Sequence, residues 1–299
     1  MSVDTIKIGV IGAGKSTVSR HIPRFQSMCG VEVFGVVNRS LESSQRVASR
    51  FGIPRVYGDW SLLVCDPEID AVFIGTWPYM HRTLVMDALK NDKHVMTQAR
   101  MANSAAEASE MLRVSLSKPH LVTQVYPSGF MSPDVMRKVV SLVHDGSLGQ
   151  IMSADFSSNY GFTDSDSLFT WRNDRRVSGF NTLLLGARYE SLMRILGPAS
   201  SVSAVTRVFK PVLSDVSLDR RVTTIPDHVE VLAELVSGGV LHMSLSRVCG
   251  FASPATLWVF GSRGTLKCIL EPSAEIWCGY KGNKELSLVE VSCDSDEVD

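Results

Sequence analysis

The sequence has no excess of either charge sign, no paired-cysteine motif and no apolar run long enough to span a membrane. Its 30 basic and 31 acidic residues give a formal net charge of −1 over 299 residues. The two signs are interspersed, so no basic stripe predicts binding to nucleic acid or to a membrane surface. No stretch approaches the roughly 20 apolar residues of a transmembrane helix, and residues 6–11 read as a strand rather than as a signal peptide.

The cysteines are scattered along the chain, and no two of them have C-x-x-C spacing. They are Cys29, Cys65, Cys249, Cys268, Cys278 and Cys293. This pattern predicts reduced thiols in a cytoplasmic protein, most of them small buried side chains, rather than a disulfide framework or a zinc site. No set of histidines, cysteines and carboxylates has metal-ligand spacing, so we expect no bound metal.

The most informative segment that is present is a glycine-rich turn between an apolar strand and a helix. A strand that ends in Gly-x-Gly and opens a helix directs backbone N–H groups at an anion, usually a pyrophosphate. The third glycine of the dinucleotide fingerprint is missing, so we expect Thr17 or Val18 to stand near its place, or the loop to be one residue longer. The cofactor-binding residues predicted in this turn are Gly12, Gly14, Lys15, Ser16 and Thr17.

The end of the second predicted strand, residues 31–37, indicates which cofactor binds. An Asp or Glu at this point, about twenty residues after the turn, selects the ribose 2′-hydroxyl of NAD. This chain instead has Asn38, Arg39 and Ser40, a cation between two neutral hydrogen-bonding groups. A guanidinium suits a 2′-phosphate, so the sequence predicts NADP(H) as the cofactor.

A second motif overlaps the same turn. Residues 9–16, Gly-Val-Ile-Gly-Ala-Gly-Lys-Ser, match the phosphate-binding loop of nucleotide hydrolases. In that motif the first glycine leaves the strand, whereas Val10 and Ile11 here continue an apolar strand through Gly9. The later strands also lack an Asp placed to bind magnesium, so we favour the dinucleotide interpretation.

The arrangement of predicted elements indicates an α/β protein of two domains. Strands and helices alternate up to about residue 125, which is typical of a doubly wound parallel Rossmann sheet. After a helix at 134–144, long alternating strands predominate, and one strong helix interrupts them at 182–196. We therefore expect a dinucleotide-binding domain at 1–125, an α+β domain with a mostly antiparallel open sheet at 126–292, and an acidic tail at 293–299.

A series of short motifs along nearly the whole chain resembles the Gfo/Idh/MocA family of nicotinamide-dependent sugar and polyol oxidoreductases. The segments that carry the resemblance are 8–14, 51–57, 66–72, 93–95, 146–149, 171–175 and 226–229. The resemblance implies a dinucleotide domain, a sheet domain that shapes a small-molecule substrate pocket, and oligomers that pair through that sheet. It also implies that Thr76, Trp77, His81, Gln98, Trp171 and Arg172 lie near cofactor or substrate.

The chain departs from the family at the residues that carry its chemistry. Ala99 stands where the family's Glu-Lys-Pro motif has its lysine, and Leu184 and Arg188 stand at the positions of an Asp and a catalytic His. Reduction of a carbonyl needs a coupled proton transfer, and arginine is a poor general base. The substitutes that we consider for positioned acids, bases or oxyanion partners are Tyr189, Tyr126, Arg100 and Glu190.

Three functions remain open at this stage. The first is an NADP(H)-dependent oxidoreductase with a non-standard acid/base set, acting on a small, cyclic and weakly polar substrate, since residues 180 and 183–185 are apolar. The second is a redox-neutral lyase, isomerase or cyclase on the same fold. The third is a non-catalytic NADP(H)-binding regulator, as in the family's galactose-pathway repressor. In each case we expect a homodimer through the second sheet.

Overall fold

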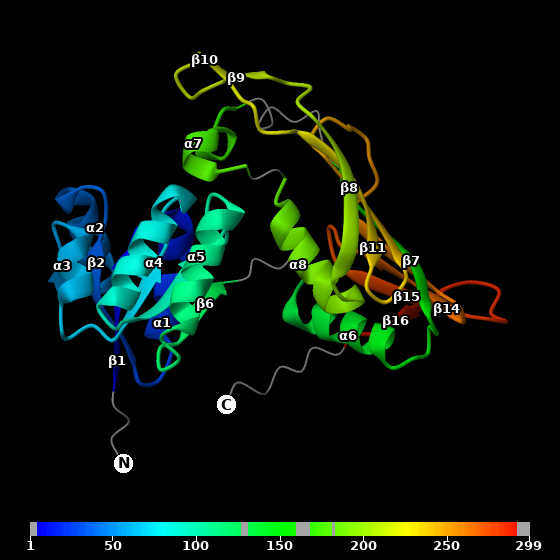
Figure 1. Cartoon of the computed structure of the whole chain (residues 1–299), viewed down its shortest axis with the longest axis horizontal. Coiled ribbons are helices and arrows are strands. Elements are labelled where there is room, and N and C mark those ends of the chain that lie inside the picture. Colours follow the sequence, from blue (N-terminus) through cyan, green and yellow to red (C-terminus); the bar gives the residue numbers. More distant parts are fainter. Residues whose placement is uncertain (1–4, 127–130, 160–167, 181–182, 292–299) are drawn as a thin grey trace. The chain divides into compact units, whose positions relative to one another are not determined.

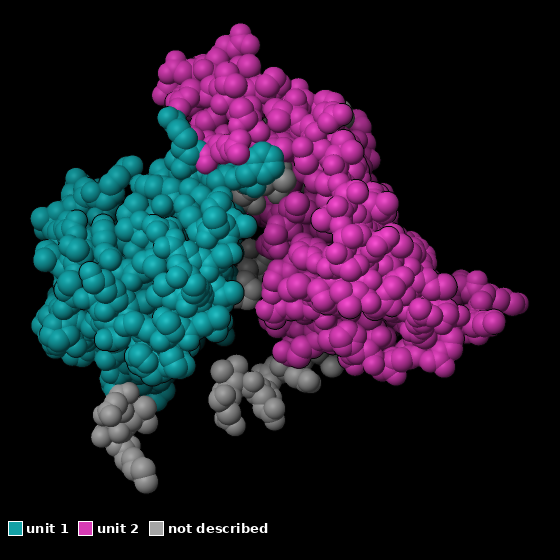
Figure 2. All heavy atoms as spheres, viewed as in Figure 1, with its two compact units in different colours: residues 1–127, 176–180 teal, residues 128–175, 181–299 magenta. Residues whose placement is uncertain are grey.

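The computed structural model of the chain describes residues 5–126, 131–159, 168–180 and 183–291. Contacts divide the chain into two compact units (Figures 1 and 2). The first comprises residues 1–127 and 176–180, and the second comprises residues 128–175 and 181–299. Segment 176–180, which the sequence analysis placed in the second domain, thus groups with the first unit. The predicted acidic tail lies outside the described residues.

The first unit contains a parallel six-stranded sheet in the order β3-β2-β1-β4-β5-β6. Its strands are β1 (Ile6–Ile11), β2 (Val31–Val37), β3 (Arg55–Val56), β4 (Ala71–Ile74), β5 (His94–Gln98) and β6 (Thr123–Tyr126). The central strands are continuous apolar runs because helices cover both faces of the sheet. Val10 and Phe73 pack into the core on one face, while their neighbours Ile11 and Ile74 pack into the core on the other. This order confirms the predicted doubly wound fold.

The helices of this unit begin and end where the sequence provides the expected signals. They are η1 (Thr17–His21), α1 (Ile22–Gln26), α2 (Leu41–Phe51), α3 (Trp60–Cys65), η2 (Pro78–Met80), α4 (His81–Lys90) and α5 (Ala105–Leu116). Helix α2 shows both signals. The Ser40 hydroxyl accepts a hydrogen bond from the Ser43 N–H at 3.3 Å, and Gly52 ends the helix in the left-handed region with φ of +65°.

The strand order reverses at β1, which lies between β2 and β4. The loops that leave the carboxyl ends of neighbouring strands therefore diverge at this point. In open α/β sheets ligands bind at such a switch point. The chain places the Gly12 turn after β1, and the segments that begin at Gly75 and Ala99 after β4 and β5.

The second unit contains an eight-stranded sheet in the order β16-β15-β14-β13-β7-β12-β11-β8. Its strands are β7 (Ile151–Asn159), β8 (Ala199–Arg207), β11 (His228–Leu235), β12 (Val240–Ser246), β13 (Thr256–Gly261), β14 (Gly264–Ile269), β15 (Glu275–Tyr280) and β16 (Ser287–Val289). Among the described strand pairings of this second sheet, only that of β7 with β12 is parallel. The sheet is therefore mostly antiparallel, as predicted. A separate hairpin joins β9 (Val212–Ser214) to β10 (Arg220–Val222).

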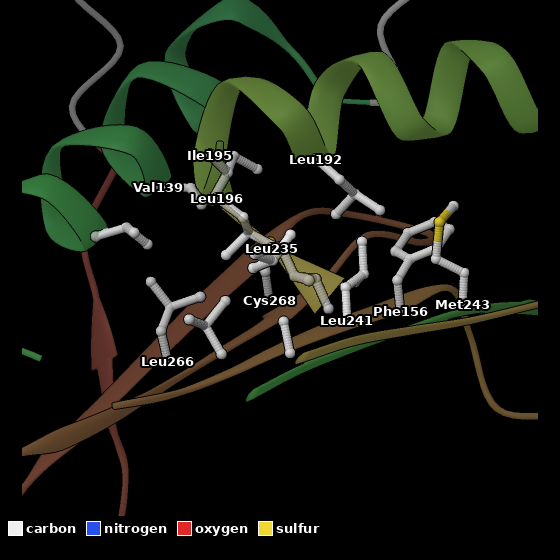
Figure 3. Close-up of a cluster of buried hydrophobic side chains, with 14 of the residues drawn as sticks. Val139, Phe156, Leu192, Ile195, Leu196, Leu235, Leu241, Met243, Leu266 and Cys268 are labelled. Atoms are coloured by element: carbon white, nitrogen blue, oxygen red, sulfur yellow. The ribbon is translucent and has the colours of Figure 1, made fainter. Parts of the chain in front are cut away.

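Helices α6 (Pro133–His144) and α8 (Leu185–Leu196) cover one face of this sheet (Figure 1). Figure 3 shows Val139 of α6 and Leu192 and Ile195 of α8 pointing toward Phe156 and Leu241 of the sheet. These helical positions recur every three or four residues, which places them on one stripe. Within the described ranges the longest helices have 12 residues, and none is long and apolar enough to cross a bilayer.

The start of α8 differs from the prediction. We expected a helix from residue 182, whereas α8 begins at Leu185, and residue 182 lies outside the described residues. Leu183 and Leu184 have φ of 52° and 59°, in the left-handed region that non-glycine residues rarely occupy. Two short elements precede α8 along the chain, namely η4 (Trp171–Asn173) and α7 (Arg175–Ser178).

Candidate functional site

The turn after β1 is built on close contact between backbone segments. Gly12 has φ of +85°, and a Cβ there would lie 2.7 Å from the Thr76 side chain and 2.8 Å from the Thr76 nitrogen. Gly75 is packed equally tightly, because its Cβ would lie 2.5 Å from the Gly12 carbonyl oxygen. Only glycine allows the ends of β1 and β4 to approach in this way.

Gly14 differs from these two glycines because it faces open space. A Cβ at Gly14 would meet nothing within 4 Å, and its φ is outside the left-handed region. Lys15 and Ser16, the next two residues, are exposed. The turn therefore presents exposed backbone and one ammonium group at the start of a helix, which fits a pyrophosphate of a dinucleotide.

The hydrolase interpretation of this turn fails on the position of Gly9. Gly9 lies inside β1, paired with Gly35 of β2 and Val72 of β4, so the chain leaves the strand three residues later than that motif requires. A Cβ on Gly9 would lie 2.6 Å from the side chain of Leu63, so this glycine serves helix–sheet packing.

The missing third glycine is accommodated by a π-helix. Thr17 is fully buried and its hydroxyl donates to the Gly12 carbonyl at 3.2 Å. The turn it opens, η1, is a π-helix, which contains one more residue per hydrogen-bonded turn than an α-helix. Thr17, one of the two residues expected near the position of the third glycine, thus packs against the Gly12 turn.

Asn38 connects the end of β2 to the Gly12 turn. Its side-chain oxygen accepts a hydrogen bond from the Ala13 N–H at 2.6 Å, and its amide nitrogen donates to the Ser43 hydroxyl at 3.0 Å. The Asn38 side chain is thus directed to the protein scaffold. Ser40 caps α2, and Arg39 between them is exposed. Arg39 is therefore the residue of this triplet best placed to meet an anion.

The predicted residues after β4 and β5 lie close to the same turn. Gln98, the last residue of β5, donates from its amide to the Ser16 hydroxyl at 3.2 Å. The Thr76 hydroxyl donates to the carbonyl of Trp77, a residue that is 41% exposed. The ends of β1, β4 and β5 thus converge on one edge of the sheet, as a nucleotide site requires.

His81 belongs to this region but is only 1% exposed. Its Nδ1 lies 2.7 Å from the carbonyl oxygen of Arg100, and its Nε2 lies 3.0 Å from the carbonyl oxygen of Thr76. Burial lowers the pKa of His81, and the charge of Arg100 lowers it further, although the carbonyl hydrogen bonds act in the opposite direction. Because this ring is buried and both of its nitrogens face backbone carbonyls, His81 holds the backbone and does not face a ligand.

Arg100 follows β5 and is bound to segment 176–180. Its Nη1 donates to the carbonyl of Ser178 at 3.0 Å and to the Ser178 hydroxyl at 2.8 Å. Gly179 packs against the same stretch, because a Cβ there would lie 2.8 Å from the Cα of Asn103. Sequence reasoning did not find this contact, since no local pattern links residue 100 to residue 178.

The remaining candidate acids and bases lie in different surroundings. Tyr126 is the last residue of β6, is 43% exposed, and meets the buried ring of His21 edge-on at 4.8 Å between centroids. In the second unit, the Tyr189 hydroxyl accepts a hydrogen bond from the Ala199 N–H at 2.9 Å. Glu190 pairs with Arg194 one turn along α8 at 2.5 Å. The structure thus does not bring these three residues together within one unit.

Trp171 and Arg172 form a capped turn in the second unit. The Thr170 hydroxyl accepts from the Arg172 N–H, and the Arg172 guanidinium lies 4.4 Å from the centre of the Trp171 ring. Burial lowers the pKa of Arg172, as does the charge of Arg247. The Arg172 cation therefore lies over the Trp171 ring, within the range of a cation–π contact.

The face of the second sheet opposite α6 and α8 has a polar network that sequence reasoning missed. His242 of β12 lies between Asp155 of β7, at 2.7 Å, and Glu230 of β11, at 2.9 Å. The Ser244 hydroxyl donates to the other oxygen of Glu230 at 2.8 Å. These contacts depend on which strands are neighbours in the sheet, and the sequence does not show this. The alternation within each strand could have indicated only that each residue lies on the polar face.

Two hollows in the second unit, of about 550 and 560 Å³, contain none of the predicted site residues. One is lined by Ser158, Asn159, residues 251–255, Glu271 and Pro272, and the other by residues 145–147, Arg263, Tyr280 and Lys281. The predicted site residues of the second unit, namely Trp171, Arg172, Tyr189 and Glu190, therefore lie outside both hollows.

Comparison with known proteins agrees with this geometry. Residues 6–126 match the family described as "Oxidoreductase family, NAD-binding Rossmann fold", and residues 136–267 match the "GFO/IDH/MocA C-terminal domain". The trans-1,2-dihydrobenzene-1,2-diol dehydrogenase of Oryctolagus cuniculus is 26% identical over 279 residues, which cover 91% of this chain and 75% of that protein.

Two solved structures show the same fold at low identity. Levoglucosan dehydrogenase in complex with NADH and L-sorbose has a TM-score of 0.80 at 19% identity, covering 95% of this chain and 80% of that one. Biliverdin reductase from Synechocystis sp. PCC 6803, in complex with biliverdin and NADP⁺, has a TM-score of 0.76 at 18% identity, covering 97% and 85%.

Some curated relatives align over less of their own length, 33% in one case and 45% in others. Whole-protein activities and substrates therefore come to this chain only as proposals. The two family matches together span most of the described residues, and they coincide with the Rossmann unit and the open-sheet unit. The chain belongs to the Gfo/Idh/MocA family of oxidoreductases with an NAD(P)-binding Rossmann fold.

Proposed function

We propose that this chain is an NADP(H)-dependent oxidoreductase that acts on a small, cyclic and weakly polar organic substrate. One observation carries the proposal. The turn after β1 leaves open space at Gly14 while Arg39 is exposed at the end of β2, where a carboxylate would select NAD. When bound, the nicotinamide would supply or accept a hydride.

Arg39 is the residue that we assign to the 2′-phosphate. A guanidinium presents planar N–H groups that match phosphate oxygens, whereas a carboxylate at this point would repel them. Asn38 already holds Ala13 and Ser43, so we propose that it shapes the pocket rather than reads the phosphate. Among the structural relatives, one was solved with NADH and another with NADP⁺, so both cofactors occur on this fold.

Tyr126 is our candidate for the proton donor. It ends β6 beside Gln98 of β5, at the carboxyl edge of the nucleotide-binding sheet, and its side chain is partly exposed. Its hydroxyl would donate a proton to the substrate oxygen as the carbonyl carbon is reduced. The hydroxyl of Tyr189 and the carboxylate of Glu190 already have partners in the second unit, so we rank them below Tyr126.

The apolar composition of residues 180 and 183–185 supports a substrate with few hydroxyl groups. Phe180 is 53% exposed in the first unit, and Leu184 is 42% exposed in the second. Two relatives are named for unsaturated ring substrates, a dihydrobenzenediol and biliverdin. We propose that Trp171 and Arg172 contribute an aromatic wall and a cation to the substrate-binding surface of the second unit.

The decisive assay is NADPH oxidation, followed by absorbance at about 340 nm, with a panel of cyclic ketones, dihydrodiols and sugars. Tyr126→Phe should reduce turnover at least about 100-fold, because general-acid catalysis contributes that much. Tyr280→Phe, a partly exposed tyrosine of the second unit, is the control. Tight NADPH binding with no turnover would favour the regulator, and turnover without cofactor would favour a redox-neutral enzyme.

The open face of the second sheet is the surface that we propose for a homodimer. Leu232 is 55% exposed there, on the side of β11 opposite the buried Val231 and Ala233. Leu288 of β16 is 56% exposed and pairs with Trp277 of β15. A self-complementary interface of this kind would remove apolar surface from water.

A further inference from the structure

His81 lies where the segments that follow β4 and β5 come together. It is the first residue of α4, and its ring reaches the carbonyl oxygen of Thr76 on one side and that of Arg100 on the other. Both contacts are within hydrogen-bond distance, at 3.0 and 2.7 Å, and the ring is buried. One side chain therefore connects the ends of two neighbouring strands.

The two partners of His81 are both hydrogen-bond acceptors. A neutral imidazole carries one N–H group and can donate to only one carbonyl, whereas an imidazolium donates to both. Burial favours the neutral ring, and Arg100 is the charged side chain whose field acts on it. On the same helix, Arg82 is paired with Glu110 at 2.6 Å. Near neutral pH, one carbonyl therefore faces a ring nitrogen without a proton.

The residues that His81 holds are themselves part of the nucleotide site. Thr76 packs so closely on Gly12 that any shift of its backbone must move the turn after β1. Arg100 anchors Ser178 through its guanidinium. The imidazole is thus connected to the phosphate-binding turn through Thr76 and to segment 176–180 through Arg100.

We propose that His81 is a positioning residue of the nucleotide site, which fixes Thr76 against the Gly12 turn and Arg100 against Ser178, and which does so most firmly as the imidazolium. The ring acts through the backbone of the site and not by contact with the nucleotide, since its two nitrogens face backbone carbonyls. Protonation adds the second hydrogen bond, so acidification should tighten nucleotide binding. This inference rests on the proposed function, because its readout is the affinity for a nicotinamide dinucleotide.

The test compares His81→Gln and His81→Phe with the wild-type chain by fluorescence titration with NADPH and NADH. Gln keeps a donor, as the neutral ring does, and Phe keeps only the ring volume. His81→Phe should therefore weaken binding about tenfold, the equivalent of one ordering hydrogen bond, whereas His81→Gln should bind as the wild-type chain does near neutral pH but should not tighten on acidification. His144→Gln is the matched control. His144 Nε2 also lies against a backbone carbonyl, that of Ile195 at 2.9 Å, but in the second unit.

The pH profile separates positioning from simple structural support. Because burial keeps the pKa of His81 below the ordinary value of about 6.5, we expect the wild-type dissociation constant for NADH to stay constant from about pH 8 to pH 6.5 and to fall at lower pH, and that of His81→Gln to stay flat throughout. NADH is the probe because it lacks the 2′-phosphate, which itself titrates near pH 6.

The outcomes are distinguishable. A wild-type chain that binds neither dinucleotide refutes the proposed function. A wild-type chain that binds, with His81→Phe showing the same affinity and His81→Gln the same pH profile, overturns only the role of His81. If circular dichroism shows that both variants are unfolded, the pH dependence of NADH binding by the wild-type chain is the remaining test. A dissociation constant that does not change with pH overturns the proposal, and one that falls on acidification supports it.

Discussion

Replacing either glycine of the turn after β1 with alanine should produce opposite phenotypes. At Gly12 a methyl group would lie 2.7 Å from Thr76 Cγ2 and 2.8 Å from its backbone nitrogen, at a φ of +85°. The left-handed backbone costs a non-glycine residue about 1–2 kcal/mol, and overpacking against backbone costs about 1–3 kcal/mol more. Gly12→Ala should therefore lower the free energy of unfolding by about 2–5 kcal/mol.

At Gly14 the same substitution meets no atom of the protein within 4 Å and no left-handed backbone. The free energy of unfolding of Gly14→Ala should stay within about 1 kcal/mol of the wild-type value. The methyl group would instead occupy the space through which a pyrophosphate approaches the backbone, so NADPH affinity should fall at least about tenfold. Stability without binding is the expected signature of this variant.

Urea unfolding followed by circular dichroism measures the first quantity, and fluorescence titration with NADPH measures the second. Gly52→Ala is the control, because Gly52 has φ of +65° but open surroundings, so it should cost only about 1 kcal/mol and leave binding unchanged. A Gly14→Ala variant that binds NADPH as the wild-type chain does would refute our assignment of the turn.

Three further predictions concern the second unit. Leu184→Gly should have a free energy of unfolding about 1 kcal/mol higher than that of Leu184→Ala, because glycine relieves the strain of a left-handed backbone at a partly exposed position. Urea unfolding measures this difference. Equal stabilities of the two variants would argue against backbone strain at residue 184. Hydrogen bonding to Asp155 and then to Glu230 raises the pKa of His242, so its stabilisation is complete below about pH 6.5 and is lost as the pH rises through the raised value. The wild-type chain should lose up to about 1 kcal/mol over that interval, His242→Gln should lose none of it, and parallel unfolding profiles would contradict the assignment. Leu232→Glu should shift the chain from dimer to monomer in sedimentation velocity, while the control Val216→Glu should not; a wild-type monomer would refute the proposed interface.

The sequence allowed the dinucleotide unit to be predicted well, because its signals are local. The apolar run of β1 and the Gly12 turn each act within a few residues, so the order of strands and helices followed. The exact end of β6, which includes Tyr126, is less easily predicted than the existence of the strand. Register between neighbouring strands, rather than apolar pattern, decides such ends.

What could not be predicted depends on contacts between distant residues. Strand β15 (Glu275–Tyr280) is only weakly indicated by the sequence, because its alternation is short and includes Gly279. The parallel pairing of β7 with β12 in an otherwise antiparallel sheet cannot be predicted from the sequence of either strand. The Arg100–Ser178 contact and the left-handed Leu183 and Leu184 likewise follow from tertiary packing, which overrides the local helical pattern.

The measurement that tests the central claim most directly is calorimetric titration of the purified chain with NADPH and with NADH. Arg39 at the end of β2 should make NADPH the tighter ligand by at least about tenfold, and Arg39→Asp should abolish or reverse that preference. No binding heat with either dinucleotide would contradict the assignment of the site, and tighter binding of NADH by the wild-type chain would contradict the assignment of the cofactor.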